Sequence, residues 1–382
     1  MKKIFLCLIS ICLILTGCSF GKKNEKTVLK EFQNMVENSE SYYLSGSMEL
    51  VNNEDVYTYD IGVSYKKDDF YKIELINVIN DHKQIILRNE EGVYIVTPSL
   101  NKSFKFQSDW PYNNSQVYLL SSLLDDITND ENRTFETTED GYLFTSIVNY
   151  PNNERLVSQN VYFDKDYLPT KVEVIDTDGN KQITMVFDKI DLKTSFNDTY
   201  FDLNSILDTE NVDDNNNNNN SSNNDKTTNN TNNNSMNSND TNSNNETQEP
   251  NNEVSENTED GKNKIKETAT IDDIIYPMYL PVNTYLTSQE RVSTENGERL
   301  ILTFTGDSSF TLVEETVSYS SRPEIIPTYG DVELIGNSLA VINDNSANWF
   351  DNGIEYYVVS DVMSTEELLQ VVKSISVLPV SK

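Results

Sequence analysis

Alternation of apolar and polar residues dominates the chain between residues 42 and 195. Short runs rich in Tyr, Val, Ile, Phe and Thr are separated by Asn, Asp and Gly turns, a pattern typical of antiparallel β-strands. We expect strands at residues 42–50, 56–65, 70–76, 83–88, 93–97, 103–106, 134–138, 142–148, 156–163, 169–175, 181–187 and 191–195. About a dozen strands joined in sequence would form a meander, which must twist and curl because wide flat sheets are disfavoured.

One segment among these strands changes from strand periodicity to helix periodicity. After the corner at Trp110-Pro111, where the residue before the proline is extended, apolar residues recur three or four positions apart. The spacing predicts a helix over residues 117–127, whose apolar stripe consists of Val117, Leu120, Leu124 and Ile127. We expect this stripe to pack on the sheet.

Two further leucines of this helix, Leu119 and Leu123, point away from the stripe, because successive helical residues diverge by roughly 100°. They either touch a neighbouring loop or stay exposed. In the second case they would form, together with Trp110, an apolar surface for a protein partner or a ligand. Trp110, Leu119 and Leu123 are therefore the candidate interaction residues.

A second amphipathic helix is predicted over residues 27–37, near the N-terminus. Its apolar residues fall on one face at helical spacing. They are Val28, Leu29, Phe32, Met35 and Val36. The opposite face is mixed in charge, which favours packing of the helix on the following sheet over contact with a membrane.

The pattern disappears after residue 207 and returns near residue 268. Residues 208–267 are rich in Asn, Ser, Thr, Asp and Glu and have few apolar side chains, so we expect a disordered linker. Residues 268–382 predict a small α+β domain with a turn at residues 349–353. Its strands are expected at residues 284–292, 300–305, 310–316, 332–335, 338–342 and 354–359. Ser364 and Glu367 form a capping box that begins a C-terminal helix.

The first 18 residues carry the pattern of an export signal. Two lysines precede an apolar run over residues 4–15, which is too short for a membrane-spanning helix of ~20 residues. The run leads into Leu-Thr-Gly-Cys, which resembles the bacterial lipobox. We therefore expect residues 1–17 to be a lipoprotein signal peptide and Cys18 to carry the lipid. The other two cysteines would leave with the signal peptide.

Charge makes one class of partner unfavourable. The chain has 62 acidic and 29 basic residues, a formal net charge of −33 at pH 7. This charge repels nucleic acid and anionic lipid head groups, so we expect no nucleic-acid partner and membrane attachment only through the lipid at Cys18. A neutral or basic protein partner is electrostatically easier to bind.

The sequence contains no recognisable catalytic or metal-binding motif. Its one histidine, His82, lies in a polar turn, which excludes a zinc site built on a histidine pair. A nucleophile elbow, a P-loop, an EF-hand and a dinucleotide fingerprint are all missing. Acidic pairs such as Asp125-Asp126 are typical of a solvated surface, although a hydrolase using two carboxylates stays an alternative. We expect a protein without catalytic residues, metal or cofactor.

The lipobox, the N-terminal helix and the order of strands around residues 92–127 together resemble the LolA/LolB/RseB superfamily. The resemblance covers residues 18–207 and is closer to the sporulation and germination lipoproteins of Firmicutes, the GerS-like group. Its more specific mark is the stretch from Val93 to Ile127, and a weaker one runs from Tyr162 to Asp176.

Residues 268–382 are similar to a C-terminal module of unknown function that accompanies such lipoproteins. In that module a Trp-x-x-x-Gly-x-x-Tyr stretch precedes the last helix, here with Trp349, Gly353 and Tyr356. The implied fold is mainly β with α+β character. It consists of a twisted antiparallel half-barrel, with helices over its concave face, and a small C-terminal α+β domain.

The resemblance implies two functions. In the germination group the scaffold binds a cortex-modifying amidase, which implies a non-catalytic scaffold or regulator on the extracytoplasmic face of the cell membrane or the forespore membrane. In carrier members the hollow holds acyl chains, which implies a lipid- or lipopeptide-binding protein. An open apolar cavity of ~300 Å³ or more would favour the carrier, and a hollow filled by side chains would favour the scaffold.

Overall fold

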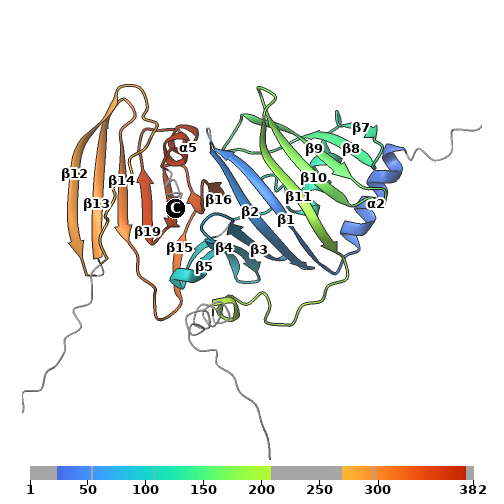
Figure 1. Cartoon of the computed structure of the whole chain (residues 1–382), viewed down its shortest axis with the longest axis horizontal. Helices are drawn as coiled ribbons and strands as arrows, with labels where there is room; N and C mark the ends of the chain where they lie inside the picture. Colours follow the sequence, from blue (N-terminus) through green and yellow to red (C-terminus); the bar gives the residue numbers. More distant parts are fainter. Residues whose placement is uncertain (1–23, 53–54, 107, 208–268, 296, 376–382) are drawn as a thin grey trace, which may run out of the picture. The chain divides into compact units, whose positions relative to one another are not determined.

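The computed structural model describes residues 24–52, 55–106, 108–207, 269–295 and 297–375 (Figure 1). Within these ranges, two β-sheets and the helices that cover them belong to one compact unit. The expected signal peptide, the lipid site at Cys18 and the linker over residues 208–267 lie outside the described residues.

The first sheet has twelve strands in the order β15-β6-β5-β4-β3-β2-β1-β11-β10-β9-β8-β7. All but one of its strands precede residue 192: β1 (Ser41–Asn52), β2 (Asp55–Lys66), β3 (Phe70–Asn77), β4 (Lys83–Asn89), β5 (Gly92–Thr97), β6 (Lys102–Phe106), β7 (Thr134–Thr137), β8 (Tyr142–Ile147), β9 (Leu156–Phe163), β10 (Pro169–Asp176) and β11 (Lys181–Asp191). The remaining strand, β15 (Glu324–Thr328), returns from the C-terminal part of the chain.

Two groups of hairpins meet at the centre of this sheet. β1 pairs antiparallel with β2 on one side and with β11 on the other, and β15 pairs with β6 in parallel. The expected single meander with only local connections is therefore wrong. The strand expected at residues 191–195 is also wrong, because β11 runs without interruption to Asp191 and turn residues follow it.

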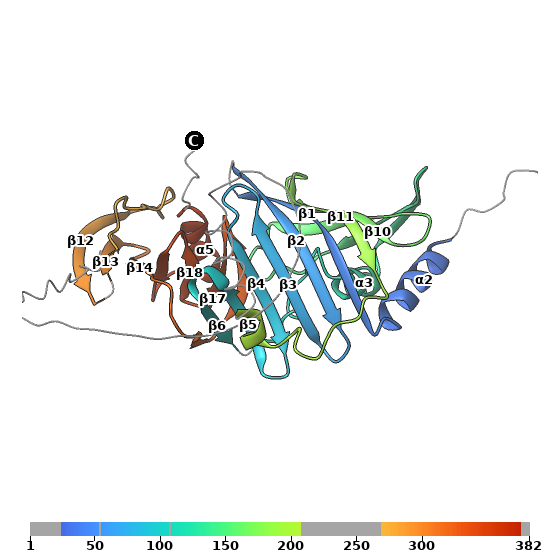
Figure 2. The same cartoon turned by 60° about the horizontal axis from the view of Figure 1, so that its bottom comes forward.

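Helix α2 (Glu25–Glu37) packs on the first sheet, as the sequence predicts (Figure 2). Asn24 caps it by accepting a hydrogen bond from the backbone N–H of Thr27 at 2.9 Å. Val28 and Phe32 are buried, and the Phe32 ring meets Phe163 of β9 edge to face at 5.0 Å. The apolar stripe of α2 is thus part of the core of the first sheet.

Helix α3 (Leu120–Asn129) lies between β6 and β7 in the chain and begins three residues later than expected. It contacts both α2 and β8. A short 3₁₀ helix, η1 (Pro98–Leu100), joins β5 to β6. The predicted fold class, mainly β with a twisted antiparallel sheet, covering helices and a smaller α+β part, is confirmed.

The opposite face of the first sheet is covered over β4 and β5 by the chain that follows β11. Phe201 and the helical residues 203–207 pack against these two strands. The buried cluster consists of Ile85, Leu87, Tyr94, Val96, Phe201, Leu203, Ile206 and Leu207. This explains why β4 and β5 read as continuous apolar runs, since strands buried on both faces do not alternate.

The second sheet has seven strands in the order β12-β13-β14-β19-β18-β17-β16. They are β12 (Thr284–Thr294), β13 (Gly297–Gly306), β14 (Phe310–Thr316), β16 (Asp331–Ile335), β17 (Ser338–Ile342), β18 (Ser346–Asp351) and β19 (Ile354–Val359). Helix α5 (Thr365–Lys373) covers part of it and is capped by Ser364, whose hydroxyl accepts a hydrogen bond from the N–H of Glu367 at 3.2 Å.

Strand β18 lies where a turn was expected at residues 349–353. Its two aromatic side chains point to opposite faces of the sheet, as successive residues of a strand do. Trp349 stacks on Tyr356 inside the second sheet at 5.1 Å, and Phe350 stacks on Phe104 of the first sheet at 4.8 Å. The expectation of a turn was wrong because only residues 352–353 turn, and the aromatic pair before them is strand.

Candidate functional site

The β16–β17 hairpin of the second sheet docks onto the first sheet through its turn. The hydroxyl of Tyr59 donates a hydrogen bond to the carbonyl oxygen of Gly336. The side-chain amide of Asn77 donates to Oδ1 of Asn337 at 3.0 Å. Gly336 has a φ of 52°, in the left-handed region that favours glycine, and it lies beside the Tyr57 ring. The turn is therefore fitted to the tyrosines of β2.

Further contacts continue this docking along the inner face of the first sheet. Oε1 of Gln84 accepts a hydrogen bond from the N–H of Leu339 at 2.6 Å, while its amide donates to Thr97 at 3.3 Å. The Phe104 and Phe350 rings are nearly parallel, with an interplanar angle of 9°. Because a buried amide with both ends bonded tolerates little displacement, Gln84 fixes the position of the hairpin.

The apolar core of the first sheet extends into the second sheet. One continuous cluster joins strands and helices of the first sheet to four residues of the second, Val332, Leu339, Val341 and Phe350. At the sheet edge, the ammonium group of Lys102 pairs with Glu324 of β15 at 2.6 Å. The inner face of the first sheet is thus filled in large part by the protein's own chain.

The three candidate interaction residues from the sequence lie inside this core. Trp110 is fully buried and meets Tyr71 edge to face at 5.8 Å. Leu119 and Leu123 are fully buried as well. The alternative in which these leucines stay exposed as a docking surface is wrong, because α3 is enclosed by α2 and the sheet and both of its apolar stripes are covered.

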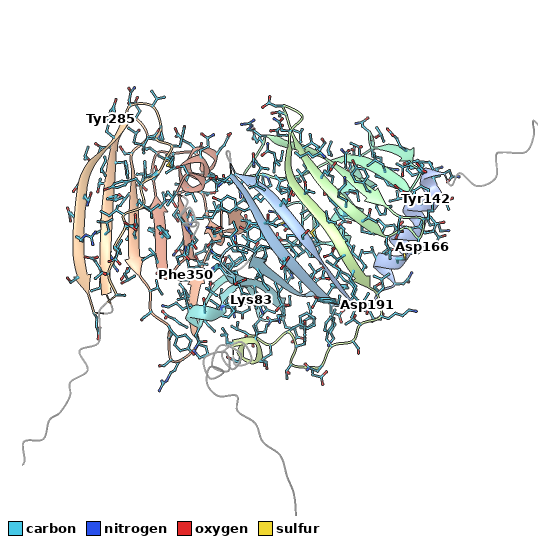
Figure 3. The ribbon with its side chains drawn as sticks, viewed as in Figure 1. Lys83, Tyr142, Asp166, Asp191, Tyr285 and Phe350 are labelled. Carbon is cyan, nitrogen blue, oxygen red and sulfur yellow. The ribbon has the colours of Figure 1, made fainter. Side chains whose placement is uncertain are left out.

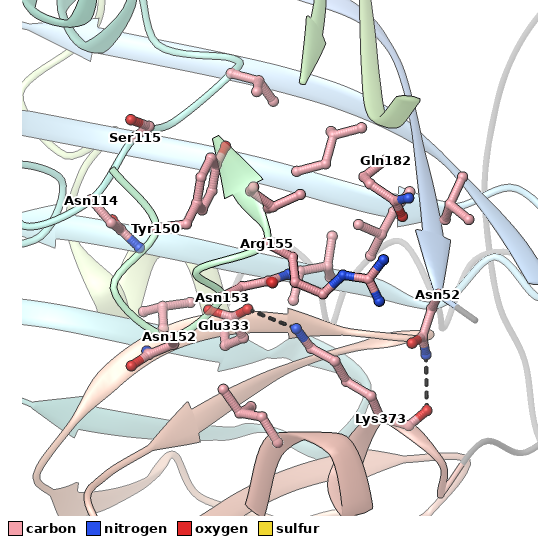
Figure 4. A pocket seen from close by; sticks show the side chains of 18 of the residues that line it. Asn52, Asn114, Ser115, Tyr150, Asn152, Asn153, Arg155, Gln182, Glu333 and Lys373 are labelled. Atoms are coloured by element: carbon pink, nitrogen blue, oxygen red, sulfur yellow. Dashed lines mark hydrogen bonds and ion pairs between the residues drawn. The ribbon is translucent and has the colours of Figure 1, made fainter. Parts of the chain in front are cut away.

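A cavity of about 560 Å³ is left between the inner face of the first sheet and the second sheet (Figure 4). Its apolar wall includes Met48, Leu75, Trp110, Ile183 and Leu339. Of the three candidate residues, only Trp110 lines this cavity. The hollow is therefore partly filled and partly open.

Charged and amide side chains surround the cavity on the side shown in Figure 4. The ammonium group of Lys373 on α5 pairs with Glu333 of β16 at 3.3 Å, and the Lys373 carbonyl accepts a hydrogen bond from the amide of Asn52 at 2.9 Å. Arg155 pairs with Asp178 at 2.8 Å. The cavity therefore combines an apolar wall with a polar side on which Asn52, Arg155, Glu333 and Lys373 already have partners.

A second cavity of about 290 Å³ lies beside α3 and has three carboxyl groups in its wall, Asp125, Asp126 and Asp130. Burial raises the pKa of Asp126 to about 6. Hydrogen bonds from Ser115 at 3.0 Å and from Gln159 at 3.0 Å act in the opposite direction and lower this pKa. Burial also raises the pKa of Asp125. Because Asp126 fastens the loop before α3 to β9, a structural role explains its burial.

The described residues provide no recognised centre for metal binding or membrane crossing. Among them, no group of three or more His, Cys, Asp and Glu side chains could hold a metal ion. Burial lowers the pKa of His82, which lies in the turn between β3 and β4. No described helix is long and apolar enough to cross a membrane.

A third feature is a run of exposed apolar residues that leads into the second sheet and includes the start of β12; we call it the β12 ridge and define it as residues 276–286. Its most exposed side chains are Met278 at 85%, Val282 at 81% and Tyr285 at 64%. Tyr285 belongs to β12, the outer strand of the second sheet (Figure 3). Tyr276, Tyr279, Leu280 and Leu286 are exposed as well.

The resemblance raised the question of a hollow, but sequence reasoning identified only Trp110 among the residues that line the cavity, and it missed the ridge. The cavity is assembled from segments far apart in the chain, near residues 50, 115, 155, 180, 333 and 370, so no local pattern indicates it. The ridge did leave a signal. Residues 276–282 hold five large apolar side chains and two prolines, and the prolines prevent the run from forming a central strand.

Comparison with known proteins gives the family. A family model described as "Sporulation protein YdcC-like" matches residues 1–201. The protein "Sporulation protein YdcC" of Bacillus subtilis (strain 168) is 30% identical over 363 residues, which cover 95% of this chain and 93% of the relative.

Solved structures also match this chain, at low identity. The MucA/MucB complex of Pseudomonas aeruginosa matches with 11% identity and a TM-score of 0.28, covering 91% of this chain and 98% of that chain. A LolA superfamily protein of Nitrosomonas europaea matches with 10% identity and a TM-score of 0.27 over 47% of this chain and 98% of that chain. The complex of the CwlD amidase and the GerS lipoprotein of Clostridioides difficile matches with 16% identity and a TM-score of 0.21 over 46% of this chain and 98% of that chain.

The predicted resemblance to sporulation proteins is confirmed. The family model spans more than half of the chain, and the Bacillus relative is matched along nearly the whole length of both proteins. This chain belongs to the YdcC-like family of sporulation proteins.

Proposed function

We propose that this protein is a non-catalytic scaffold that holds a protein partner on the extracytoplasmic face of a membrane during sporulation. Attachment is through a lipid on Cys18, which the lipobox supports. The partner class that the GerS-like sequence resemblance implies is a cortex-modifying amidase. A basic or neutral binding surface on that partner suits a chain with a net charge of −33.

The observation that carries this proposal is the filling of the hollow. In a carrier, the concave face of the sheet is kept free for acyl chains. Here Trp110, the β16–β17 hairpin and Phe350 occupy much of that face, and Gln84 and Asn77 fix the hairpin with buried hydrogen bonds. A sheet packed on its inner face by its own chain supports a rigid platform rather than a container.

The cavity of about 560 Å³ favours a second candidate function, a lipid- or lipopeptide-binding protein. Its volume exceeds the ~300 Å³ at which small-ligand sites begin. Met48, Leu75 and Ile183 would face an acyl chain, and Arg155 and Lys373 lie near the polar end. We place it second because three of the charged groups around the cavity, Arg155, Glu333 and Lys373, already form ion pairs.

The two functions are separated by purifying the full-length chain and its Cys18→Ala variant from sporulating Bacillus subtilis. Bound proteins and lipids are then identified by mass spectrometry. Cys18→Ala removes the covalent lipid, so any lipid that remains in the purified variant is bound non-covalently. We expect a protein partner, with a cell-wall amidase as the class, and no lipid near one equivalent on the variant.

A cavity-filling variant sharpens the result. Leu50→Trp adds bulk to the cavity wall without adding charge. A scaffold should keep its partner in this variant, whereas a carrier should lose its ligand. Stoichiometric lipid on Cys18→Ala that Leu50→Trp displaces, with no protein partner recovered, would overturn the scaffold and establish the carrier.

A further inference from the structure

Strand β12 is an unusually long sheet edge. It has 11 residues and stands at the end of the second sheet, paired on one side with β13. The other three edges are short, with 4 residues in β7 and 5 residues each in β15 and β16. Within the described residues no strand pairs with the outer side of β12. Long unprotected edges are rare because they attract other strands.

The side chains of β12 and of the segment before it are exposed to an unusual degree. All but three of the β12 residues are exposed, including Tyr285 and Val292. Met278 and Val282, which precede the strand, are among the most exposed large apolar side chains of the described residues. Met278 lies near the end of α5, where its N–H bonds to Ser374, so the apolar side chains at the edge itself are those of β12, such as Tyr285 and Val292. Exposed apolar groups on a sheet edge mark an interaction surface.

This ridge is held in place although its side chains are not buried. The N–H of Ile275 donates to Glu314 at 3.1 Å, and the N–H of Met278 donates to the carbonyl of Ser374 at 3.1 Å. The N–H of Ile271 donates to Glu298 at 3.0 Å. Because hydrogen bonds on both sides of Tyr276 fix the backbone, a partner would meet a preformed surface and would not have to order it.

The charges around β12 indicate the sign of the partner. Arg291 pairs with Glu298 at 2.5 Å, so the one cation of the strand is already neutralised. Asp273, Glu290 and Glu295 are exposed and form no ion pair with the described residues. A basic segment would find three unpaired carboxylates there. A second copy of this chain would bring the same acids and a net charge of −33.

We infer that β12 docks an extended segment of the protein partner, added as a further strand along the outer edge and carrying apolar and basic side chains. The backbone edge of β12 would supply hydrogen bonds, Tyr285 and Val292 would contact apolar side chains and the acids would pair with basic ones. This inference rests on the proposed scaffold function and names the surface through which it acts.

The test uses the full-length chain in detergent and a fluorescent synthetic peptide of eleven residues, the length of β12, that alternates Val with Lys. Binding is measured by fluorescence anisotropy. The edge variant Tyr285→Lys with Val292→Lys places lysines on the strand, as natural edges do. The matched control is Val56→Lys with Ile147→Lys, two exposed apolar strand residues of the first sheet given the same charges.

We expect the edge variant to bind the peptide at least about 10-fold more weakly than the control, with unchanged melting temperatures. A peptide of equal charge with proline at its centre should bind at least about 10-fold more weakly to the wild-type chain, because it cannot complete a strand. Equal affinities for the edge variant and the control, or for the two peptides, would overturn the inference. Concentration-dependent dimers that the edge variant abolishes would assign the edge to a second copy instead.

The same variants distinguish this inference from the proposed function. If the wild-type chain recovers a protein partner from sporulating cells and the edge variant recovers equal amounts, the scaffold stands and this surface is wrong. If the wild-type chain recovers no partner, the scaffold itself fails. Loss of the partner in the edge variant, with retention in the control, supports both.

Discussion

The two sheets use the same antiparallel pairing but differ in what surrounds them. The first sheet is covered on its inner face by α2, α3 and the β16–β17 hairpin, and on its outer face over β4 and β5 by residues 196–207. The second sheet leaves an 11-residue strand at its edge with exposed side chains. The difference separates a region built for packing from a region available for contact.

The comparison also shows why apolar character alone does not locate a binding surface. Leu123 and Met278 are both large apolar residues, and both stand in apolar runs of the sequence. Leu123 is fully buried, whereas Met278 is 85% exposed. What distinguishes the two runs is the pair of prolines, Pro277 and Pro281, which keep the second run out of any strand.

The largest effect is expected for Leu123→Ala. This substitution removes a fully buried side chain from the core of the first sheet and should lower the free energy of unfolding by about 2–5 kcal/mol. Denaturant unfolding followed by circular dichroism measures the loss. The matched control is Ile147→Ala, at an exposed position of β8, which should change stability by less than about 0.5 kcal/mol.

A small effect of Leu123→Ala would contradict the enclosed position of α3. It would indicate that Leu123 is exposed and would support the alternative from the sequence, in which Leu119 and Leu123 form a docking surface. An effect near the predicted range confines the search for partner contacts to the second sheet and the cavity.

An intermediate effect is expected from the titration of Glu314 on β14. Its side chain is buried, and burial raises its pKa to about 7, against a hydrogen bond from Ile275 and the charge of Arg291. The unfolded chain ionises Glu314 near its ordinary pKa of 4.5. Between these two pKa values the folded state holds a proton that the unfolded state has released. Stability contributed by this group should therefore fall as the pH rises from about 4.5 to about 7.

Glu314→Gln tests this by removing the titration. Relative to the wild type, the variant should gain about 1–3 kcal/mol of unfolding free energy between pH 5 and pH 8. Glu366→Gln, at a position on the first turn of α5, serves as a control for the change in net charge. Parallel pH profiles for the wild type and Glu314→Gln would show that Glu314 is ionised in the folded protein at every pH tested.

The smallest effect on stability is expected at the ridge. Met278→Ser and Val282→Ser change exposed side chains whose backbone is held by other groups, so each should alter the free energy of unfolding by less than about 0.5 kcal/mol. Thermal and denaturant unfolding measure both. A loss above about 2 kcal/mol would mean that the ridge packs against part of the chain outside the described residues.

Much of the local structure could be predicted because it follows from short-range rules. The stripe that includes Val28 and Phe32 predicted α2 and its packing, and Ser364 with Glu367 predicted the start of α5. Most strands were also found from alternation. These elements depend on residues within a few positions of each other, so a single sequence contains the patterns that predict them.

The features that could not be predicted depend on contacts between distant residues. β15 contains Pro327, which argues against a strand, and its partner β6 is about two hundred positions earlier. The burial of Leu119 followed from α2 and the sheet enclosing α3, which no local spacing specifies. The cavity could not be predicted for the same reason, because Met48 and Lys373 come to line one cavity only after the hairpin docks.

The parallel pairing of β15 with β6 has a consequence for how the chain matures. Lys102 and its partner Glu324 are separated by 222 positions, so a growing chain displays the β6 edge long before the strand that covers it exists. Non-local pairs of this kind form slowly because a long loop must close first. During synthesis the outer edge of β6 would therefore stay unpaired until β15 has been made. A chain that ends before residue 324 would lack β15, so this edge of the first sheet would remain unpaired.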